Sequence, residues 1–228
     1  MSDNENTTVV DYYDSIAEKY DDNRFNNSYG RFIDYEERRL LDRLIDCQTD
    51  RLRLEMACGT GRLTNYATHG LDASGEMMKL AQQRHKDVSF RLASATETGY
   101  DDNMFDTVYT FHLMMHLDDA TIGDIFTEAY RILKPGGQFI FDIPSKKRRK
   151  MLHHRQQSWH GGTELSTNDV RQLCSDRFDI VSRHGIMMLP VHKLPKVMRK
   201  PLQRTDYGMA NSFMREYSSY LVFELKKK

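Results

Sequence analysis

The spacing of apolar residues changes near residue 50, and each half of the chain predicts different elements. From Val9 to Tyr20, and again from about Arg31 to Ile45, apolar and aromatic residues recur every three or four positions, which is the period of a helix with one buried face. Later, short apolar segments alternate with helical patterns. They predict strands at 52–57, 70–72, 88–93, 106–111 and 138–143, with the clearest helices at 74–85 and 120–133.

Strands separated by helices predict an α/β fold, a doubly wound and mostly parallel sheet with helices on both faces. The C-terminal third predicts a helix near Ser166, a strand from Phe178 to about Met188, a basic segment punctuated by prolines at 192–204, and a last strand from Tyr217 to Leu225. No full crossover helix separates the two late strands, so we expect an antiparallel pair at the sheet edge.

The length of 228 residues fits one domain. We expect a disordered polar tail at 1–8, N-terminal helices at 9–46 and the main domain at 47–228. A hydrophobic content of 39% excludes a disordered chain. Three cysteines without a C-x-x-C pair indicate a reducing compartment and argue against a zinc site, so no metal is expected. The chain has neither a membrane-spanning apolar run nor a signal-like start, which predicts a cytoplasmic protein.

Charge is segregated along the chain although its net value is zero. Residues 145–204 contain 14 basic and 4 acidic side chains, a net charge of +10, and the remainder therefore carries −10. Within 192–204, basic residues alternate with apolar ones, which suits an anionic group on an apolar tail or a membrane surface. Nucleic acid fits less well, because no aromatic stacking platform is present. The alternative interpretation is that these basic residues lie on solvated helix faces and bind no ligand.

A glycine-containing turn with an acid before it is the most informative chemical signal. Glu55 lies within a predicted strand, and Gly59 and Gly61 follow in a turn where the lack of Cβ permits close approach of a ligand. Asp72 ends the next strand, beside this turn, where a carboxylate can accept both ribose hydroxyls of a nucleoside. The structural alternatives are a tight strand-to-helix connection for the turn and a helix cap for Asp72.

Four segments in order resemble the class I S-adenosylmethionine-dependent methyltransferases, over roughly Val10 to Ile143. They are 55–61, 70–78, 94–106 and 131–137. The resemblance implies a seven-stranded sheet with a reversed final strand, an N-terminal helical lid and S-adenosylmethionine as cofactor. The cofactor contacts that it implies are Glu55, Ala57, Gly59, Gly61, Asp72, Ser94, Ala95 and Thr110.

The chain departs from the family pattern at three places. Ala57 replaces a common glycine, a mild change if the turn needs no positive φ there. Ser94 replaces a common aspartate that receives the adenine amino group. The short spacing between Gly61 and Asp72 leaves room for a crossover helix of about two turns. A nicotinamide dehydrogenase fits worse, because Thr64 stands where its third glycine is required.

Methyl transfer from a sulfonium depends mainly on positioning, and a general base is optional. His112 and His116 follow the fourth predicted strand and are the candidate bases, with packing as the alternative for each. We expect the substrate to meet the lid tyrosines, an apolar wall and the basic segment. The residues predicted for this role are Tyr12, Tyr20, Met114, Met115 and Arg148.

Three functional hypotheses follow. The first is a methyltransferase acting on a small molecule that is lipid-like or otherwise anionic, including one presented at a membrane. The second is an RNA or protein methyltransferase that holds a polymer on the basic segment. The third is a non-catalytic, cofactor-binding partner subunit. Fold alone does not name the acceptor atom.

Overall fold

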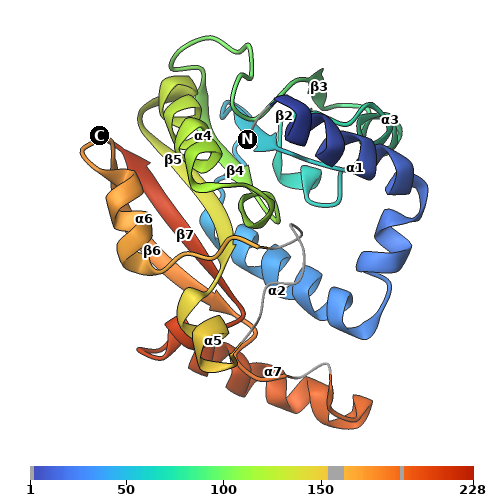
Figure 1. Ribbon diagram of the computed structural model, residues 1–228, viewed down its shortest axis with the longest axis vertical. Helices are drawn as coiled ribbons and strands as arrows, with labels where there is room; N and C mark the ends of the chain where they lie inside the picture. The colour runs from blue at the N-terminus through green and yellow to red at the C-terminus, as the bar shows by residue number, and fades with distance from the viewer. Residues whose placement is uncertain (1–2, 154–161, 191–192) are drawn as a thin grey trace.

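A seven-stranded sheet of order β3-β2-β1-β4-β5-β7-β6 forms the centre of the computed structural model, which describes residues 3–153, 162–190 and 193–228 (Figure 1). The strand pairs from β3 to β5 are parallel, and β7 runs antiparallel to both β5 and β6. This order confirms the predicted α/β class, the doubly wound sheet and the reversed final strand. The strands are β1 (Arg53–Met56), β2 (His69–Asp72), β3 (Ser89–Leu92), β4 (Phe105–Thr110), β5 (Leu133–Pro144), β6 (Phe178–Ile186) and β7 (Tyr220–Lys227).

Helices cover both faces of this sheet, as the sequence predicted. They are α1 (Asp3–Arg24), α2 (Ser28–Leu44), α3 (Gly75–Arg84), α4 (Asp119–Ile132), α5 (Lys146–Met151), α6 (Thr167–Cys174) and α7 (Lys196–Ala210). Short 3-10 turns are η1 (Thr64–Tyr66), η2 (Met114–His116) and η4 (Arg215–Tyr217). In Figure 1, α1 and α3 lie beside each other at one end of the molecule, and α5 and α7 lie together at the other.

The alternation of side chains along β5 divides the interior into two cores. Phe139 and Phe141 point to one face, where their rings lie 5.4 and 5.2 Å from that of Phe126 on α4. Ile140 points to the opposite face and packs in the core that contains Leu41 of α2. Because successive side chains of a strand face opposite sides, the three consecutive apolar residues 139–141 of β5 are what a strand buried on both faces requires.

Three segments differ from the elements that the sequence predicted. Helix α1 begins at Asp3, within the tail predicted to be disordered, and continues to Arg24. The first crossover is the single turn η1 rather than a two-turn helix, because Thr64 donates a hydrogen bond to buried Glu55 and so draws the segment directly over β1. The basic segment forms α7 in spite of Pro201 within it.

Within the region 145–204 that carries the net charge of +10, residues 154–161 and 191–192 lie outside the described residues, as do residues 1–2 of the predicted tail. Among the described helices, none combines the length and the apolar character that crossing a membrane requires.

Candidate active site

A cavity of about 440 Å³ lies where β1, β2 and β4 end, beneath α1. Parallel strands place the loops at their carboxyl ends around one crevice, which is where ligands bind in open α/β sheets. The described side chains and turns around it come from α1, the glycine turn, β2, the loops after β3 and β4, and α4. They include Val9, Tyr13, Tyr20, Ala57, Gly59, Asp72, Ser94, Ala95, Thr96, Phe111, His112, His116 and Ile125.

Gly59 and Asp72 form the polar end of this cavity. Gly59 has φ +55°, and a Cβ built on it would meet no atom within 4 Å, so the glycine faces open space that a side chain would occupy. The Gly59 amide donates to Asp72 Oδ2 at 2.7 Å, and the Ser74 amide donates to Oδ1 at 2.8 Å. Burial raises the pKa of Asp72, and these amide bonds oppose the rise. A bare turn beside an anchored carboxylate fits the ribose and amino-acid parts of S-adenosylmethionine.

Glu55 and Gly61 are not brought to the cavity. Glu55 is buried under η1, and burial raises its pKa to about 8 despite the hydrogen bond from Thr64. A Cβ on Gly61 would lie 3.1 Å from the Cα of Ala81, so this glycine permits the close packing of α3 against the turn. In this arrangement, both residues support the turn that carries Gly59.

Ser94 and Ala95 line the cavity after β3, in the position that the sequence predicted for an adenine contact. The Ser94 hydroxyl accepts from the Thr96 amide at 3.2 Å and lies 2.8 Å from the Thr96 hydroxyl. This turn supplies hydroxyl and backbone groups in place of the missing aspartate. Thr110 lies in the core, and its hydroxyl forms no hydrogen bond with any described group.

Ala57 adopts a left-handed conformation with φ +54°. Replacing the common glycine by Ala57 was expected to be mild only if the turn has no positive φ at this position. The turn does have a positive φ there, so the replacement is not mild. A residue with a Cβ pays about 1 to 2 kcal/mol for this conformation.

Ala57→Gly is expected to raise the free energy of unfolding by roughly 0.5 to 1 kcal/mol, because the released strain exceeds the extra chain entropy of glycine. Urea denaturation followed by circular dichroism measures this change. The matched control is Ala120→Gly on α4, an ordinary helical position, which is expected to lower stability by about 0.5 to 1 kcal/mol. A loss of stability in both variants would contradict the strain at Ala57.

Two aspartates fasten α1 over the cavity. Asp14 accepts hydrogen bonds from the Ser74 hydroxyl and the Glu76 amide at the start of α3. Asp21 accepts from the Thr60 hydroxyl at 2.7 Å and pairs with Arg84 of α3. The lid predicted from the N-terminal pattern is therefore tied to the glycine turn and to α3.

Aromatic rings of α1 form the cavity wall below this lid. Tyr13 and Tyr20 line the cavity with ring centroids 5.9 Å apart, and the ring of Tyr13 lies 6.1 Å from that of His116. Burial raises the pKa of both tyrosines, which therefore stay neutral. Tyr12 is half-exposed and lies outside the cavity wall.

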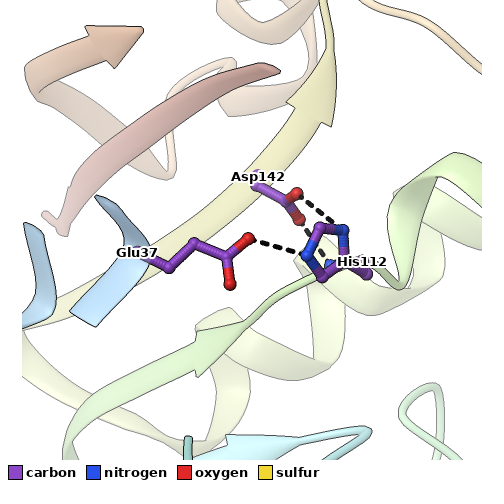
Figure 2. A group of neighbouring side chains, drawn as sticks. All are labelled: Glu37, His112 and Asp142. Carbon is purple, nitrogen blue, oxygen red and sulfur yellow. Dashed lines mark hydrogen bonds and ion pairs between the residues drawn. The ribbon is translucent and has the colours of Figure 1, made fainter. Parts of the chain in front are cut away.

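His112 lies between two buried carboxylates contributed by distant segments (Figure 2). Its Nε2 is 2.7 Å from Glu37 Oε1 of α2, and its Nδ1 is 3.5 Å from Asp142 Oδ2 of β5. The His112 amide also donates to Asp142 Oδ1 at 2.6 Å, which holds this residue at φ +60°. Arg62 completes the group, because its Nη2 lies 2.6 Å from Glu37 Oε2.

The charges of these four residues balance one another. Burial lowers the pKa of His112, but Glu37 and Asp142 outweigh it and raise the pKa overall. Burial favours a neutral Glu37, yet Arg62 and His112 hold its pKa below the usual range. Burial raises the pKa of Asp142 to about 6. Glu37, His112 and Asp142 are close enough to hold a metal ion. However, Arg62 and a protonated His112 already neutralise the two carboxylates.

The imidazole of His112 is expected to titrate above 6.5, and Glu37→Gln is expected to lower its pKa by removing the nearer carboxylate. Histidine-labelled NMR titration measures both. The raised pKa also means that the stabilisation from His112 is complete below pH 6.5 and is lost as the pH rises through the pKa of the folded state. Asp102→Asn, at an exposed ion pair with Arg131, is the control and should leave the titration unchanged. A midpoint below 6.5 in the wild type would contradict the ion network.

The remaining predicted substrate residues lie away from the cavity. Met114 and Met115 are buried in the two cores on opposite faces of the sheet. Arg148 Nη1 donates to the carbonyls of Met188 and Tyr217, both at 2.7 Å, and so joins α5 to the chain before β7. Sequence reasoning placed these residues by their distance along the chain, which does not report which way a side chain points.

Glu37, Arg62 and Asp142 were not predicted as site residues, although two of them left a signal in the sequence. Glu37 lies four residues from both Ile33 and Leu41, on the apolar face of its helix. Asp142 interrupts the apolar run of β5. An acid at a position that the pattern buries requires a partner, and this rule would have selected both.

Comparison with known proteins supports the resemblance found in the motifs. Residues 54–141 match the family of methyltransferase domains. A demethylmenaquinone methyltransferase from Symbiobacterium thermophilum is 31% identical over 147 residues, which make up 58% of this chain and 57% of that protein. A phosphoethanolamine N-methyltransferase from Triticum aestivum is 31% identical over 108 residues, 42% of this chain and 21% of that protein. The aligned parts thus span less than two thirds of either relative.

The fold comparison agrees. The crystal structure of a SAM-dependent methyltransferase from Thermotoga maritima superimposes with a TM-score of 0.66 at 20% identity, covering 87% of this chain and 90% of that one. The sheet order, the anchored Asp72 and the family match identify residues 54–141 as a methyltransferase domain. The fold and the sequence motifs are similar to those of the class I, S-adenosylmethionine-dependent methyltransferases.

Proposed function

We propose that this chain transfers a methyl group from S-adenosylmethionine to a small and largely apolar acceptor. The observation that carries the proposal is one cavity that joins the Gly59 and Asp72 end to an aromatic end formed by Tyr13, Tyr20 and His116. The cofactor would occupy the first end and the acceptor the second. The demethylmenaquinone and phosphoethanolamine methyltransferases act on small molecules by their names, which supports a small-molecule acceptor here.

The residues around the cavity contribute mainly by position. Asp72 would hold the ribose, Gly59 would allow the backbone to approach the amino-acid part, and the turn at Ser94 would face the adenine. S-adenosylmethionine supplies an activated methyl group when bound, so holding the acceptor atom within roughly 3 to 3.5 Å of that group in line provides most of the acceleration.

The two histidines take different roles in this proposal. Both ring nitrogens of His112 face carboxylates, so we assign it a positioning role between α2, β4 and β5. His116 lies at the acceptor end beside Tyr13, where an imidazole can take the proton that a hydroxyl or an acidic carbon loses on methylation.

The closed lid favours a small molecule over a polymer. Asp14 and Asp21 tie α1 across the cavity, and the wall beneath it is aromatic and aliphatic. The basic segment, which would hold RNA or an acidic protein, contributes no described residue to this wall. The alternative is a non-catalytic, cofactor-binding role, and the experiment below distinguishes it from catalysis.

The test supplies methyl-labelled S-adenosylmethionine with a cell extract and fractionates the product into lipid, other small molecules, RNA and protein. Label in a small-molecule or lipid fraction is expected, with loss in Asp72→Ala and a lowered kcat in His116→Gln. Label in RNA or protein would overturn the choice of acceptor. Cofactor binding by calorimetry without transfer to any fraction would favour the partner-subunit alternative. Absence of cofactor binding would overturn the proposal altogether.

A further inference from the structure

Exposed apolar side chains gather at the end of the molecule formed by α5, α7 and η4. Among the described residues, eleven large apolar side chains are exposed, and seven of them lie in α5, α7 and η4 or in the residues that directly follow α5 and α7. Phe213 is 93% exposed and Val197 is 85% exposed. We name the C-terminal surface by its seven members: Met151, Leu152, Val197, Met198, Phe213, Met214 and Tyr217. Grouped exposure of this kind marks an interaction site, whereas isolated exposed apolar residues do not.

Specific contacts hold the three segments together as one surface. Lys147 of α5 pairs with Glu216 of η4 at 2.9 Å. Arg148 binds the Tyr217 carbonyl. The chain from α7 to η4 is fixed by Arg215, which donates to the carbonyls of Asn211 and Ser212. Figure 1 shows α5 and α7 side by side at this end, away from α1 and α3. These contacts fix α5, η4 and the chain after α7 relative to one another, and Val197 and Met198 lie in the first turn of α7, at the opposite end of that helix.

The charge around this surface indicates the kind of partner that it binds. Residues 145–204, which contain α5 and the first part of α7, carry the net charge of +10, and the rest of the chain carries −10. Lys150, Lys193 and Arg204 are exposed and form no ion pair within the part of the chain that the structure describes. A surface that combines apolar side chains with unpaired cations matches an anionic bilayer, where apolar groups enter the interface and cations face lipid headgroups.

The surface is also connected to the candidate active site. Tyr217 lies just before β7, and Tyr220 begins that strand with its ring 5.5 Å from the ring of His112. Tyr29 of α2 meets the Tyr220 hydroxyl at 3.4 Å. A partner that binds at η4 therefore binds only a few residues along the chain from Tyr220, whose ring packs against His112.

We propose that the C-terminal surface docks the protein on anionic lipid bilayers. Phe213 and Val197 enter the interface, and Lys150, Lys193 and Arg204 contact acidic headgroups. Docking itself does not depend on methyl transfer. If the proposed function also holds, docking brings the enzyme to the phase in which an apolar acceptor dissolves.

Co-sedimentation of the full chain with vesicles tests the proposal. Vesicles of phosphatidylcholine mixed with phosphatidylglycerol are expected to bind the protein, pure phosphatidylcholine vesicles to bind much less, and added salt to release it. Phe213→Asp and Val197→Asp are each expected to lower the partition coefficient at least tenfold, because each removes an apolar side chain from the interface and adds a negative charge beside acidic headgroups.

Val181→Asp is the matched control, because Val181 is exposed on β6 outside the surface. It should bind vesicles like the wild type, and circular dichroism should show all variants folded. Equal binding to both vesicle types, or equal binding by Phe213→Asp and the wild type, would overturn the proposal. A dimer in light scattering that Phe213→Asp converts to a monomer, without vesicle binding by the wild type, would instead assign the surface to self-association.

Discussion

Asp72→Ala is expected to weaken S-adenosylmethionine binding by about 1.5 to 3 kcal/mol, or roughly ten- to a hundredfold in Kd, as measured by calorimetry. The carboxylate lines the cavity, and the Gly59 and Ser74 amides fix its orientation. Alanine would remove the proposed acceptor of the ribose hydroxyls, and it also releases the Gly59 amide. Binding of the demethylated product should weaken by a similar factor, because the two ligands share the ribose.

A second variant separates this binding role from helix capping. Ser166→Ala removes the cap of α6, outside the described cavity wall, and is expected to lower the free energy of unfolding by about 1 kcal/mol without changing Kd. If Asp72→Ala behaves in the same way, with lower stability and unchanged affinity, Asp72 is a structural residue and the assignment of the ribose end is wrong.

Arg62→Met is expected to lower the free energy of unfolding by about 3 to 5 kcal/mol, the range for removing one partner of a buried ion pair. Arg62 pairs with Glu37, whose side chain is 1% exposed, and with Asp34, and its guanidinium lies 4.0 Å above the ring of Phe25. Methionine preserves much of the packing. The buried carboxylate of Glu37 then has His112 as its remaining cationic partner. Chemical denaturation measures the loss.

Arg62→Met combined with Glu37→Gln should recover most of the lost stability, because no buried charge then lacks its partner. Lys79→Met is the control at the exposed pair with Glu76 and should cost less than about 1 kcal/mol. An equal, small loss at Arg62 and Lys79 would show that the buried network contributes no more than a surface ion pair.

The sequence predicted the fold well because its signals are local. Alternation and helical spacing located the strands of the parallel sheet, and the turn from Glu55 to Gly61 with Asp72 located the polar end of the cavity. The antiparallel pairing of the last two strands is confirmed, but its premise was wrong, because helix α7 lies between β6 and β7. The positions of the strands, the helices and the glycine turn depend on residues that are close in sequence, so their spacing can be read from the sequence alone.

The network around His112 depends on contacts that spacing does not report. Glu37, Arg62 and Asp142 come from three separate segments, and they meet only after the sheet has formed. The orientations of Met114 and Met115 likewise depend on η2, a single turn that sends each to a different core. The positive φ of Ala57 is set by the turn as a whole, so its identity alone could not reveal the strain.

The two aspartates of α1 also set a kinetic requirement. Every turnover would exchange spent for fresh cofactor in a cavity that α1 partly covers, with Asp14 bound to α3 and Asp21 bound to the glycine turn. Where the cofactor passes α1, the strength of these contacts trades its residence time against throughput. Loosening them would shorten the lifetime of the bound complex and speed product escape. Tightening them would make departure, rather than chemistry, the slow step.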